Sequence, residues 1–290
     1  MKSSSILPIV SAISTIDRLL DAVRRLRCRF LWVDRVCLVM ARAAAGRMKK
    51  IRRGLGKGLL LDVGDGPVGY LIGDPEPDVN LALGALLGPG LTFYDIGANV
   101  GYYTLIGARL VGPAGRVIAF EPAPQNLARL RHNVALNHLG NVAVRVEALG
   151  DTDGAASFAL AADPTQNKLA AQTKASDRIV GRVGVNVRRL DGLIEAEKLP
   201  LPDFIKMDIE GGEVKALIGA RETLRQSRPA LVIELHDTAR EVTSLLGELG
   251  YRIYTLMPRR ELGALHIVAL PKERADLRGR IAEFSAPFEL

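Results

Sequence analysis

The segment Asp95–Gly101 constrains this chain more than any other, because it sets two glycines, Gly97 and Gly101, between an apolar run and a helix-like segment. The apolar run is Leu91–Tyr94, and the helix-like segment is Tyr102–Leu110. The order is strand, tight turn, helix. Glycine lacks a Cβ and tolerates positive φ, so such a turn lets backbone N–H groups at a helix N-terminus approach a ligand closely. A nucleotide-like ligand is the first expectation.

A second apolar run, Arg116–Phe120, ends in Glu121, twenty residues after Gly101. In a doubly wound sheet, a carboxylate at the tip of the second strand accepts hydrogen bonds from ribose hydroxyls. That feature suits NAD, but a dinucleotide turn is normally GxGxxG, whereas here Asp95 precedes the first glycine and Asn99 follows it. S-adenosylmethionine has a ribose, an ammonium group for an acidic neighbourhood and no phosphate. The turn therefore favours S-adenosylmethionine, with a purely structural turn as the alternative.

Strands and helices alternate after this turn, which predicts an α/β fold with a parallel sheet. The expected strands are 116–120, 142–147, 203–208 and 230–235, and the expected helices are 124–138, 211–226 and 238–249. Two final runs, 251–256 and 264–270, predict a hairpin. The result is a seven-stranded, mostly parallel sheet with helices on both faces and one reversed strand.

Two regions beside this core are less regular. Before the sheet, Leu59–Val63 and Gly69–Ile72 are short strand candidates, and a helix is expected over 77–87. Between the third and fourth strands, residues 150–190 predict a loop or hairpin at the rim of the pocket. Long loops in compact domains are usually functional or disordered. We expect this segment to shape acceptor recognition and to leave cofactor affinity unchanged.

Charge divides the chain into two parts. The chain carries +7 overall, whereas residues 1–60 hold fourteen Lys/Arg and three Asp, so the remainder is net negative. A DNA or RNA methylase would place basic residues around its active site, so nucleic acid is not expected as a partner. We expect a basic amphipathic helix with its linker over 1–58 and a catalytic domain over 59–290. Within that domain, 59–90 is an extension, 91–270 the sheet core and 271–290 a tail.

The N-terminal helix is predicted over 16–44, where apolar residues recur at steps of three and four. Three fates compete for it: packing on the catalytic domain, pairing in a homodimer, or lying on an anionic membrane surface. Cys28 and Cys37 form no metal-binding or redox motif. No apolar stretch approaches the ~20 residues that span a bilayer. We expect a cytoplasmic protein, with peripheral contact at the inner face of the membrane as one option.

Further blocks follow in a collinear order. They are Phe120–Pro122 with Asn126, Leu130 and Asn133, then Ala148–Asp151 with Gly154, then Ile205–Glu213 and Glu234–His236. Over roughly residues 70–240 the chain resembles the FkbM-type S-adenosylmethionine-dependent methyltransferases, and the Lys-x-Asp-x-Glu-Gly block at 206–211 is the most specific part. The resemblance implies a class I methyltransferase (Rossmann-like) fold. It also implies S-adenosylmethionine as methyl donor and mostly O-methylation of hydroxyls on sugars, glycans or secondary metabolites.

The first strand and its turn are expected to hold the methionine end of the cofactor. Asp95 would hydrogen-bond the cofactor's amino group, directly or through the turn, or else cap the following backbone. Gly97 and Gly101 allow close approach. Asn99 would bond the turn itself or the methionine carboxylate.

The next strands are expected to hold the nucleoside. Glu121 would accept the ribose hydroxyls, and Glu147 would reach the adenine amino group or face solvent. Asn126 and Asp208 complete the expected cofactor contacts.

Candidate catalytic residues gather at the carboxyl end of the fourth strand, where ligands bind in open α/β sheets. Lys206, Asp208 and Glu210 share one face of a strand, so Lys206 is expected to keep Asp208 charged. The structural alternative is a buried salt bridge without catalytic consequence. Glu210 also lies where a helix begins, and a carboxylate there is favoured by the helix dipole.

His236, one of four histidines, is the expected proton acceptor for a hydroxyl nucleophile, with Asp208 and Glu234 as rivals. A metal is a further option, since Asp208, Glu210 and Glu234 or His236 would form an oxygen-rich set suited to Mg²⁺. The spacing of these residues does not decide whether a metal binds, and Mg²⁺ is not favoured.

Two other classes of function remain open. One is an NAD-dependent oxidoreductase, and the other is a catalytically inactive nucleotide-binding module. A third reading keeps methyl transfer but places the enzyme on a membrane as a glycolipid modifier, held there by the basic helix.

Overall fold

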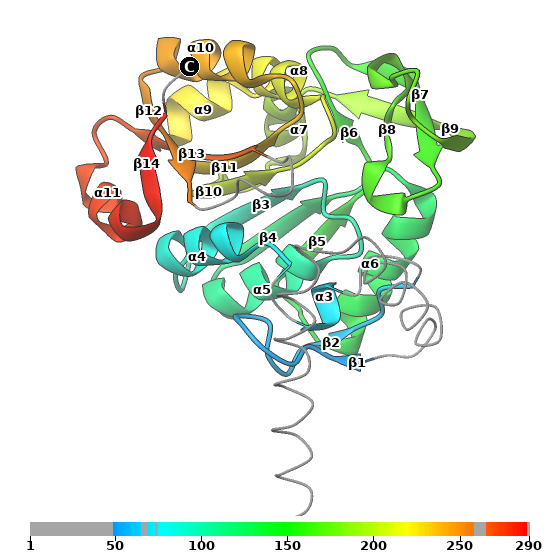
Figure 1. Ribbon diagram of the computed structural model, residues 1–290, viewed down its shortest axis with the longest axis horizontal. Coiled ribbons are helices and arrows are strands. Elements are labelled where there is room, and N and C mark those ends of the chain that lie inside the picture. Colours follow the sequence, from blue (N-terminus) through cyan, green and yellow to red (C-terminus); the bar gives the residue numbers. More distant parts are fainter. Residues whose placement is uncertain (1–48, 65–68, 73–74, 258–264, 289–290) are drawn as a thin grey trace, which may run out of the picture. The chain divides into compact units, whose positions relative to one another are not determined.

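The computed structural model describes residues 49–64, 69–72, 75–257 and 265–288. Its main sheet has eight strands in the order β14-β12-β13-β11-β10-β3-β4-β5 (Figure 1). The strands are β3 Thr92–Ile96, β4 Arg116–Phe120, β5 Val142–Arg145, β10 Phe204–Met207, β11 Ala230–Leu235, β12 Tyr251–Leu256, β13 Leu265–Pro271 and β14 Ser285–Pro287.

The strand directions agree with the mostly parallel sheet and terminal hairpin expected from the sequence, and one further strand is added. Strands β3, β4, β5, β10 and β11 pair in parallel, and β13 is antiparallel to both β11 and β12. The expected count of seven strands with one reversed is corrected by β14, a second reversed strand whose Ser285 pairs with Leu256. Three residues give no periodic signal, so this edge strand depends on tertiary contacts. The expected tail 271–290 also contains α11 Ala275–Ile281 and the 3₁₀ turn η3 Ala282–Phe284.

Helices cover both faces of the sheet because side chains alternate along each strand. Phe93 of β3 packs in the core beneath α4 Pro77–Leu86 and α5 Tyr102–Val111, while its neighbour Tyr94 packs in the core of the opposite face. Helix α6 Pro124–Leu136 joins the first face, and α11 packs there as well. The opposite face is covered by α7 Leu190–Glu197, α8 Glu213–Gly219, α9 Arg221–Ser227 and α10 Ala239–Glu248. Figure 1 shows the two layers below and above the sheet.

The segment between β5 and β10 forms a second, four-stranded sheet in the order β6-β9-β7-β8. Its strands are β6 Ala148–Leu149, β7 Gly154–Ala161, β8 Lys168–Leu169 and β9 Ile179–Arg188. Strands β7 and β9 pair antiparallel, as a hairpin requires. Two 3₁₀ turns, η1 Pro164–Gln166 and η2 Ala170–Gln172, lie between them along the chain.

Several local expectations differ from the structure. Gly69–Ile72 forms the short helix α3 rather than a strand, and Leu59–Val63 contributes only the two-residue strand β2 Leu60–Leu61, paired with β1 Lys49–Lys50. Part of the expected linker therefore packs in the catalytic domain, since Ile51 is buried in the core. The single helix expected over 211–226 is divided at Ala220 into α8 and α9. The compact unit is Gly46–Leu290.

The predicted helix at 16–44 lies outside the described residues. Within the described ranges, no helix combines the length and the apolar character that crossing a bilayer requires.

Candidate active site

The turn after β3 adopts a backbone that only a few residue types tolerate. Gly97, Asn99 and Gly101 all have positive φ, at 81°, 51° and 95°. A Cβ added to Gly97 would lie 1.8 Å from the backbone oxygen of Asp208, so only glycine fits there. A Cβ at Gly101 would lie 2.6 Å from a methyl carbon of Leu130 on α6. The turn is therefore packed against the end of β10 on one side and α6 on the other.

Glu121 follows β4 and lies against this turn. Its two carboxylate oxygens accept hydrogen bonds from the backbone N–H groups of Asn99 and Ala123, each at 2.8 Å. Burial raises the pKa of Glu121 to about 7, although the two N–H donors act in the opposite direction. Each carboxylate oxygen can accept more than one hydrogen bond, so Glu121 retains acceptor capacity for a ligand hydroxyl.

Asp95 was expected to reach the cofactor directly or through the turn, or to cap the following backbone. Its side chain is fully buried, and it is absent from the pocket lining. One carboxylate oxygen accepts a 2.5 Å hydrogen bond from the Thr104 hydroxyl, and the other has no hydrogen-bond partner. Burial raises the pKa of Asp95, while Lys206 on the neighbouring strand lowers it. The carboxylate of Asp95 is bonded to Thr104 of α5 and does not line the pocket. Asp95 can therefore affect a ligand only through the glycine turn that follows it.

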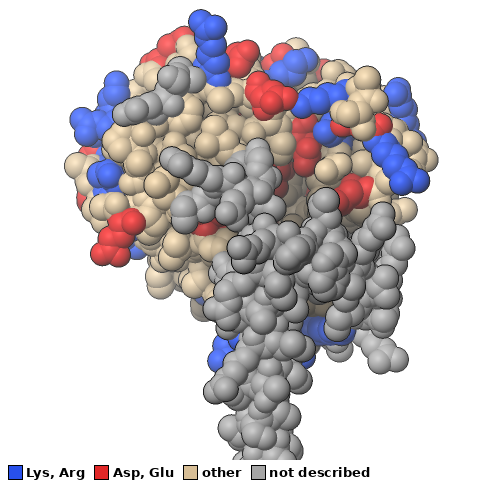
Figure 2. All heavy atoms as spheres, viewed as in Figure 1, with Lys and Arg blue, Asp and Glu red and all other residues tan. Residues whose placement is uncertain are grey.

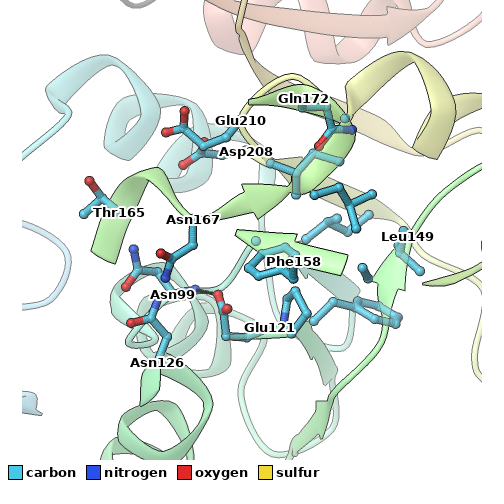
Figure 3. Close-up of a pocket in the computed structure, with 18 of the residues that line it drawn as sticks. Asn99, Glu121, Asn126, Leu149, Phe158, Thr165, Asn167, Gln172, Asp208 and Glu210 are labelled. Carbon is cyan, nitrogen blue, oxygen red and sulfur yellow. Dashed lines mark hydrogen bonds between the residues drawn. The ribbon is translucent and has the colours of Figure 1, made fainter. Parts of the chain in front are cut away.

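A pocket opens over the tips of β3 and β4 (Figure 3). Its empty space, including the open mouth, is about 610 Å³. Seven of the residues expected at the site line it: Gly97, Asn99, Glu121, Asn126, Glu147, Asp208 and Glu210. The lining does not include Asp95, Gly101, Lys206 or His236.

The second sheet and its turns form one wall of the pocket, at the rim where the sequence placed residues 150–190, although no lining residue was named there. The lining residues from this part are Ala148, Leu149, Phe158, Pro164, Thr165, Asn167, Leu169 and Gln172. Figure 3 shows Phe158 between Glu121 and the residues near Leu149. The only signal for this wall in the sequence is the length of the insertion. The wall lies at the same pocket as Glu121, and its expected role in acceptor recognition stays a prediction.

Asn126 joins α6 to this wall. Its amide nitrogen donates a 3.1 Å hydrogen bond to the Pro164 carbonyl, while its amide oxygen is buried without a hydrogen-bond partner. A buried acceptor that lacks a donor costs free energy, so a ligand donor here would be favourable.

Glu147 also lies at the pocket wall, but its carboxylate is already engaged. Arg145 donates to it at 2.7 Å and donates at 2.6 Å to Glu197 of α7. An adenine contact would have to share this carboxylate with Arg145.

The charged end of the pocket is built around Asp208. Burial raises the pKa of Asp208, but Lys206 and His236 outweigh that effect, so the pKa lies below its usual value. Lys206 donates a 3.1 Å hydrogen bond to Asp208 and lies 5.2 Å from the centre of the Tyr103 ring. Lys206 is therefore a buried counter-ion that holds Asp208 in its ionised form.

His236 lies among four carboxylates. Its Nδ1 is 3.1 Å from Glu213, and its Nε2 is 3.6 Å from Glu234, 3.7 Å from Glu210 and 4.0 Å from Asp208. Burial lowers the pKa of His236, but the hydrogen bond to Glu213 and the other carboxylates raise it to about 9. His236 is thus mostly protonated at neutral pH.

Two groups of side chains could hold a metal ion among the described residues. Asp208, Glu234 and His236 offer ligand atoms within 4.8 Å of one another, and so do Glu76, Glu234 and His266. The first group contains three of the four residues considered for Mg²⁺ from the sequence, whereas Glu210 is not part of it. Glu234 belongs to both.

The chain is similar to curated methyltransferases. It is 29% identical over 157 residues to the hexuronic acid methyltransferase AglP of Haloferax volcanii, an alignment covering 53% of this chain and 61% of the relative. It is 28% identical over 201 residues to the 31-O-demethyl-FK506 methyltransferase FkbM of Streptomyces tacrolimicus, covering 59% of this chain and 76% of that protein. The chain thus spans about three fifths of the length of the Haloferax relative.

Solved structures give a more distant likeness. The methyltransferase FkbM from Methylobacillus flagellatus KT is 22% identical, with a TM-score of 0.45, covering 62% of this chain and 43% of that one. The strand order seen here is the stronger observation on the fold.

The family assignment comes from a model of the methyltransferase FkbM domain, which matches residues 95–253, more than half of the chain. The matched region begins at Asp95 and includes the glycine turn, Glu121, the 206–211 block and His236. This chain belongs to the FkbM family of S-adenosylmethionine-dependent methyltransferases.

Proposed function

We propose that this chain transfers a methyl group from S-adenosylmethionine to a hydroxyl oxygen of a sugar, glycan or secondary metabolite. The observation that carries the proposal is the placement of Glu121 at the turn of β3, in a pocket that also contains Asp208. The names of the relatives support an oxygen acceptor, since one acts on a hexuronic acid and another is a 31-O-demethyl-FK506 methyltransferase.

The residues present fit this cofactor. Glu121 offers acceptor capacity for ribose hydroxyls, and the buried amide oxygen of Asn126 lacks a donor. The missing Cβ of Gly97 lets the turn pack against the backbone oxygen of Asp208, which keeps both segments together at the pocket. When bound, S-adenosylmethionine supplies an electrophilic methyl group whose leaving group is a neutral thioether.

The protein then has to align the acceptor and take up one proton, because methyl transfer to a hydroxyl breaks the O–H bond as the O–CH₃ bond forms. We assign the proton to His236, whose Nε2 faces Asp208, Glu210 and Glu234. Its pKa of about 9 makes it a strong base that is scarce in the neutral form at pH 7. With His236 as base, the rate rises with pH up to about 9; with Asp208 as base, it is flat above neutrality.

Two measurements test the proposal. Calorimetry should show S-adenosylhomocysteine bound by the full chain and NAD not bound; the reverse result would indicate an oxidoreductase. A screen with methyl-labelled S-adenosylmethionine against neutral sugars, uronic acids and macrolide alcohols should then yield a labelled product with an ether linkage. Cofactor binding without transfer to any of these acceptors would favour an inactive binding module.

The face shown in Figure 2 supports a small-molecule or glycan acceptor rather than nucleic acid. The Lys and Arg side chains visible there are interspersed with acidic ones. Nucleic-acid sites gather positive charge on one surface.

Membrane contact or dimerisation through residues 16–44 stays a proposal, as does a cytoplasmic location. Flotation with anionic vesicles, comparing the full chain with a chain starting at Gly46, would test membrane contact. Equal flotation of the two would count against it.

A further inference from the structure

A second cluster of chemically reactive side chains lies outside the pocket lining. Glu76 immediately precedes α4, Glu234 is on β11 and His266 is on β13. Strand pairing sets Glu234 directly opposite His266. One ligand atom from each of the three side chains lies within 4.8 Å of the other two.

His266 is held in an unusual way. It is 2% exposed, and its Nδ1 lies 2.7 Å from the carboxylate of Asp78, which is equally buried. Its Nε2 lies 3.3 Å from Glu234, yet it has no partner that satisfies hydrogen-bond geometry. A carboxylate that accepts the Nδ1–H of a histidine fixes the ring and leaves Nε2 directed at a ligand, the arrangement that supports histidines bound to metals.

The carboxylates face the same place. Glu76 accepts a 2.6 Å hydrogen bond from the Tyr103 hydroxyl, which orients it, and Glu234 approaches the imidazole from the other strand. Asp78, Glu76 and Glu234 thus bring three carboxylates to one imidazole, and buried charges are normally paired or coordinate metals.

We propose that Glu76, Glu234 and His266 bind one divalent transition-metal ion, with Asp78 orienting the imidazole. Two carboxylates and one imidazole suit Mn²⁺, Fe²⁺ or Zn²⁺ better than Mg²⁺, because nitrogen ligands favour transition metals. Metal binding at this cluster does not depend on the proposed methyl transfer.

The set differs from Asp208, Glu234 and His236, for which Mg²⁺ was considered from the sequence. In that group His236 is partly exposed, and its Nε2 lies 3.6 Å or more from the carboxylates of Asp208, Glu210 and Glu234. Glu76 and His266 are specific to the proposed site, while His236 is specific to the other. Variants of these residues therefore distinguish the two.

The experiment uses the full chain, stripped with EDTA and titrated with MnCl₂ by calorimetry. One equivalent of Mn²⁺ should bind, and pulsed electron paramagnetic resonance should detect coupling to an imidazole nitrogen. Glu76→Gln and His266→Gln should weaken binding at least tenfold, and Asp78→Asn should weaken it by about 10- to 100-fold because the imidazole loses the carboxylate that orients it. Glu197→Gln is the matched control, since Glu197 pairs with Arg145 and belongs to neither group of candidate ligands, and its Mn²⁺ affinity should stay within about twofold of wild type. His236→Gln should weaken binding less than Glu76→Gln or His266→Gln, because His236 contacts Glu234 but is not a ligand of the proposed site.

Three results would overturn the proposal: no binding of Mn²⁺ or Zn²⁺ at about 1 mM, equal binding by wild type and both Gln variants at Glu76 and His266, or loss in His236→Gln alone. Circular dichroism identifies a variant that fails to fold. If His266→Gln fails to fold, the test uses Glu76→Gln, whose position is only half-buried, together with the nitrogen coupling measured for the wild type. Failure of cofactor binding with intact Mn²⁺ binding would refute the proposed function and leave the metal site standing.

Discussion

Replacing Glu121 by Gln tests the nucleoside half of the site with a change of one atom. The amide keeps the shape of the side chain but removes its charge and turns one acceptor oxygen into a donor. In the structure, both oxygens are within 2.8 Å of backbone N–H groups, at Asn99 and Ala123, so one of these donors would face an NH₂ group. Hydrogen bonds from ribose hydroxyls to a charged acceptor contribute about 1.5–3 kcal/mol. We therefore expect Glu121→Gln to weaken S-adenosylhomocysteine binding about 10- to 150-fold.

The pH dependence of that affinity gives an independent readout. Because burial raises the pKa of Glu121 to about 7, the carboxylate is largely protonated at pH 6 and ionised at pH 8. If the ionised form binds the ribose, wild-type affinity should fall about tenfold from pH 8 to pH 6. The variant has no ionisable group at this position and should lose that part of the dependence.

Calorimetry at several pH values measures both effects. Glu197→Gln is the matched control, since Glu197 makes a charge-assisted contact with Arg145 but does not line the pocket. Its affinity should equal that of wild type. Equal affinity of Glu121→Gln and wild type, or the same pH dependence in both, would refute the assignment.

The turn and the histidine give two further predictions. Gly97→Ala places a side chain at a positive φ and sets its Cβ 1.8 Å from the Asp208 oxygen. We therefore expect the free energy of unfolding, measured with urea, to fall by about 2–5 kcal/mol. Gly88→Ala is the control and should change it little, because a Cβ there meets nothing within 4 Å. His236 has a pKa raised to about 9, so its contribution to stability is full below about pH 6.5 and is lost as the pH rises through 9. The Tm of wild type should therefore fall between pH 7 and 9.5 by more than that of His236→Gln, and parallel curves would contradict the shift.

The sequence predicted the parts of the fold that carry a local signal. Strands β4, β11 and β12 have the expected bounds because apolar or aromatic residues make up most of each run. The turn at Gly97 was recognisable because positive φ and close packing both require glycine.

Other parts depend on tertiary contacts that no local pattern records. Gly69–Ile72 looks like a strand but forms a helical turn, and β14 is paired only because it meets the edge strand β12. The helix over 211–226 is divided near Gly219, where a Cβ would lie 1.9 Å from the Gly150 oxygen. In that region, packing against the second sheet overrides helix propensity.

The site shows the same division. Glu121 and Asp208 follow strands of the sheet, so the position of each in the chain places it at the pocket. Phe158 and Asn167 come from an insertion whose folding back over the pocket cannot be read from periodicity. His266 lies within an apolar run, and only strand pairing brings it opposite Glu234.

The glycine turn after β3 packs against the backbone oxygen of Asp208 through main chain alone, since a Cβ on Gly97 would lie 1.8 Å from that oxygen. Exchanging the side chain of Asp208 therefore leaves the packing of these two strand ends in place. If the chain transfers a methyl group as proposed, side chains elsewhere on the rim can vary with the acceptor without disturbing this packing. The second sheet, which packs over the pocket from a separate layer, is the part of the described chain where such variation would cost least.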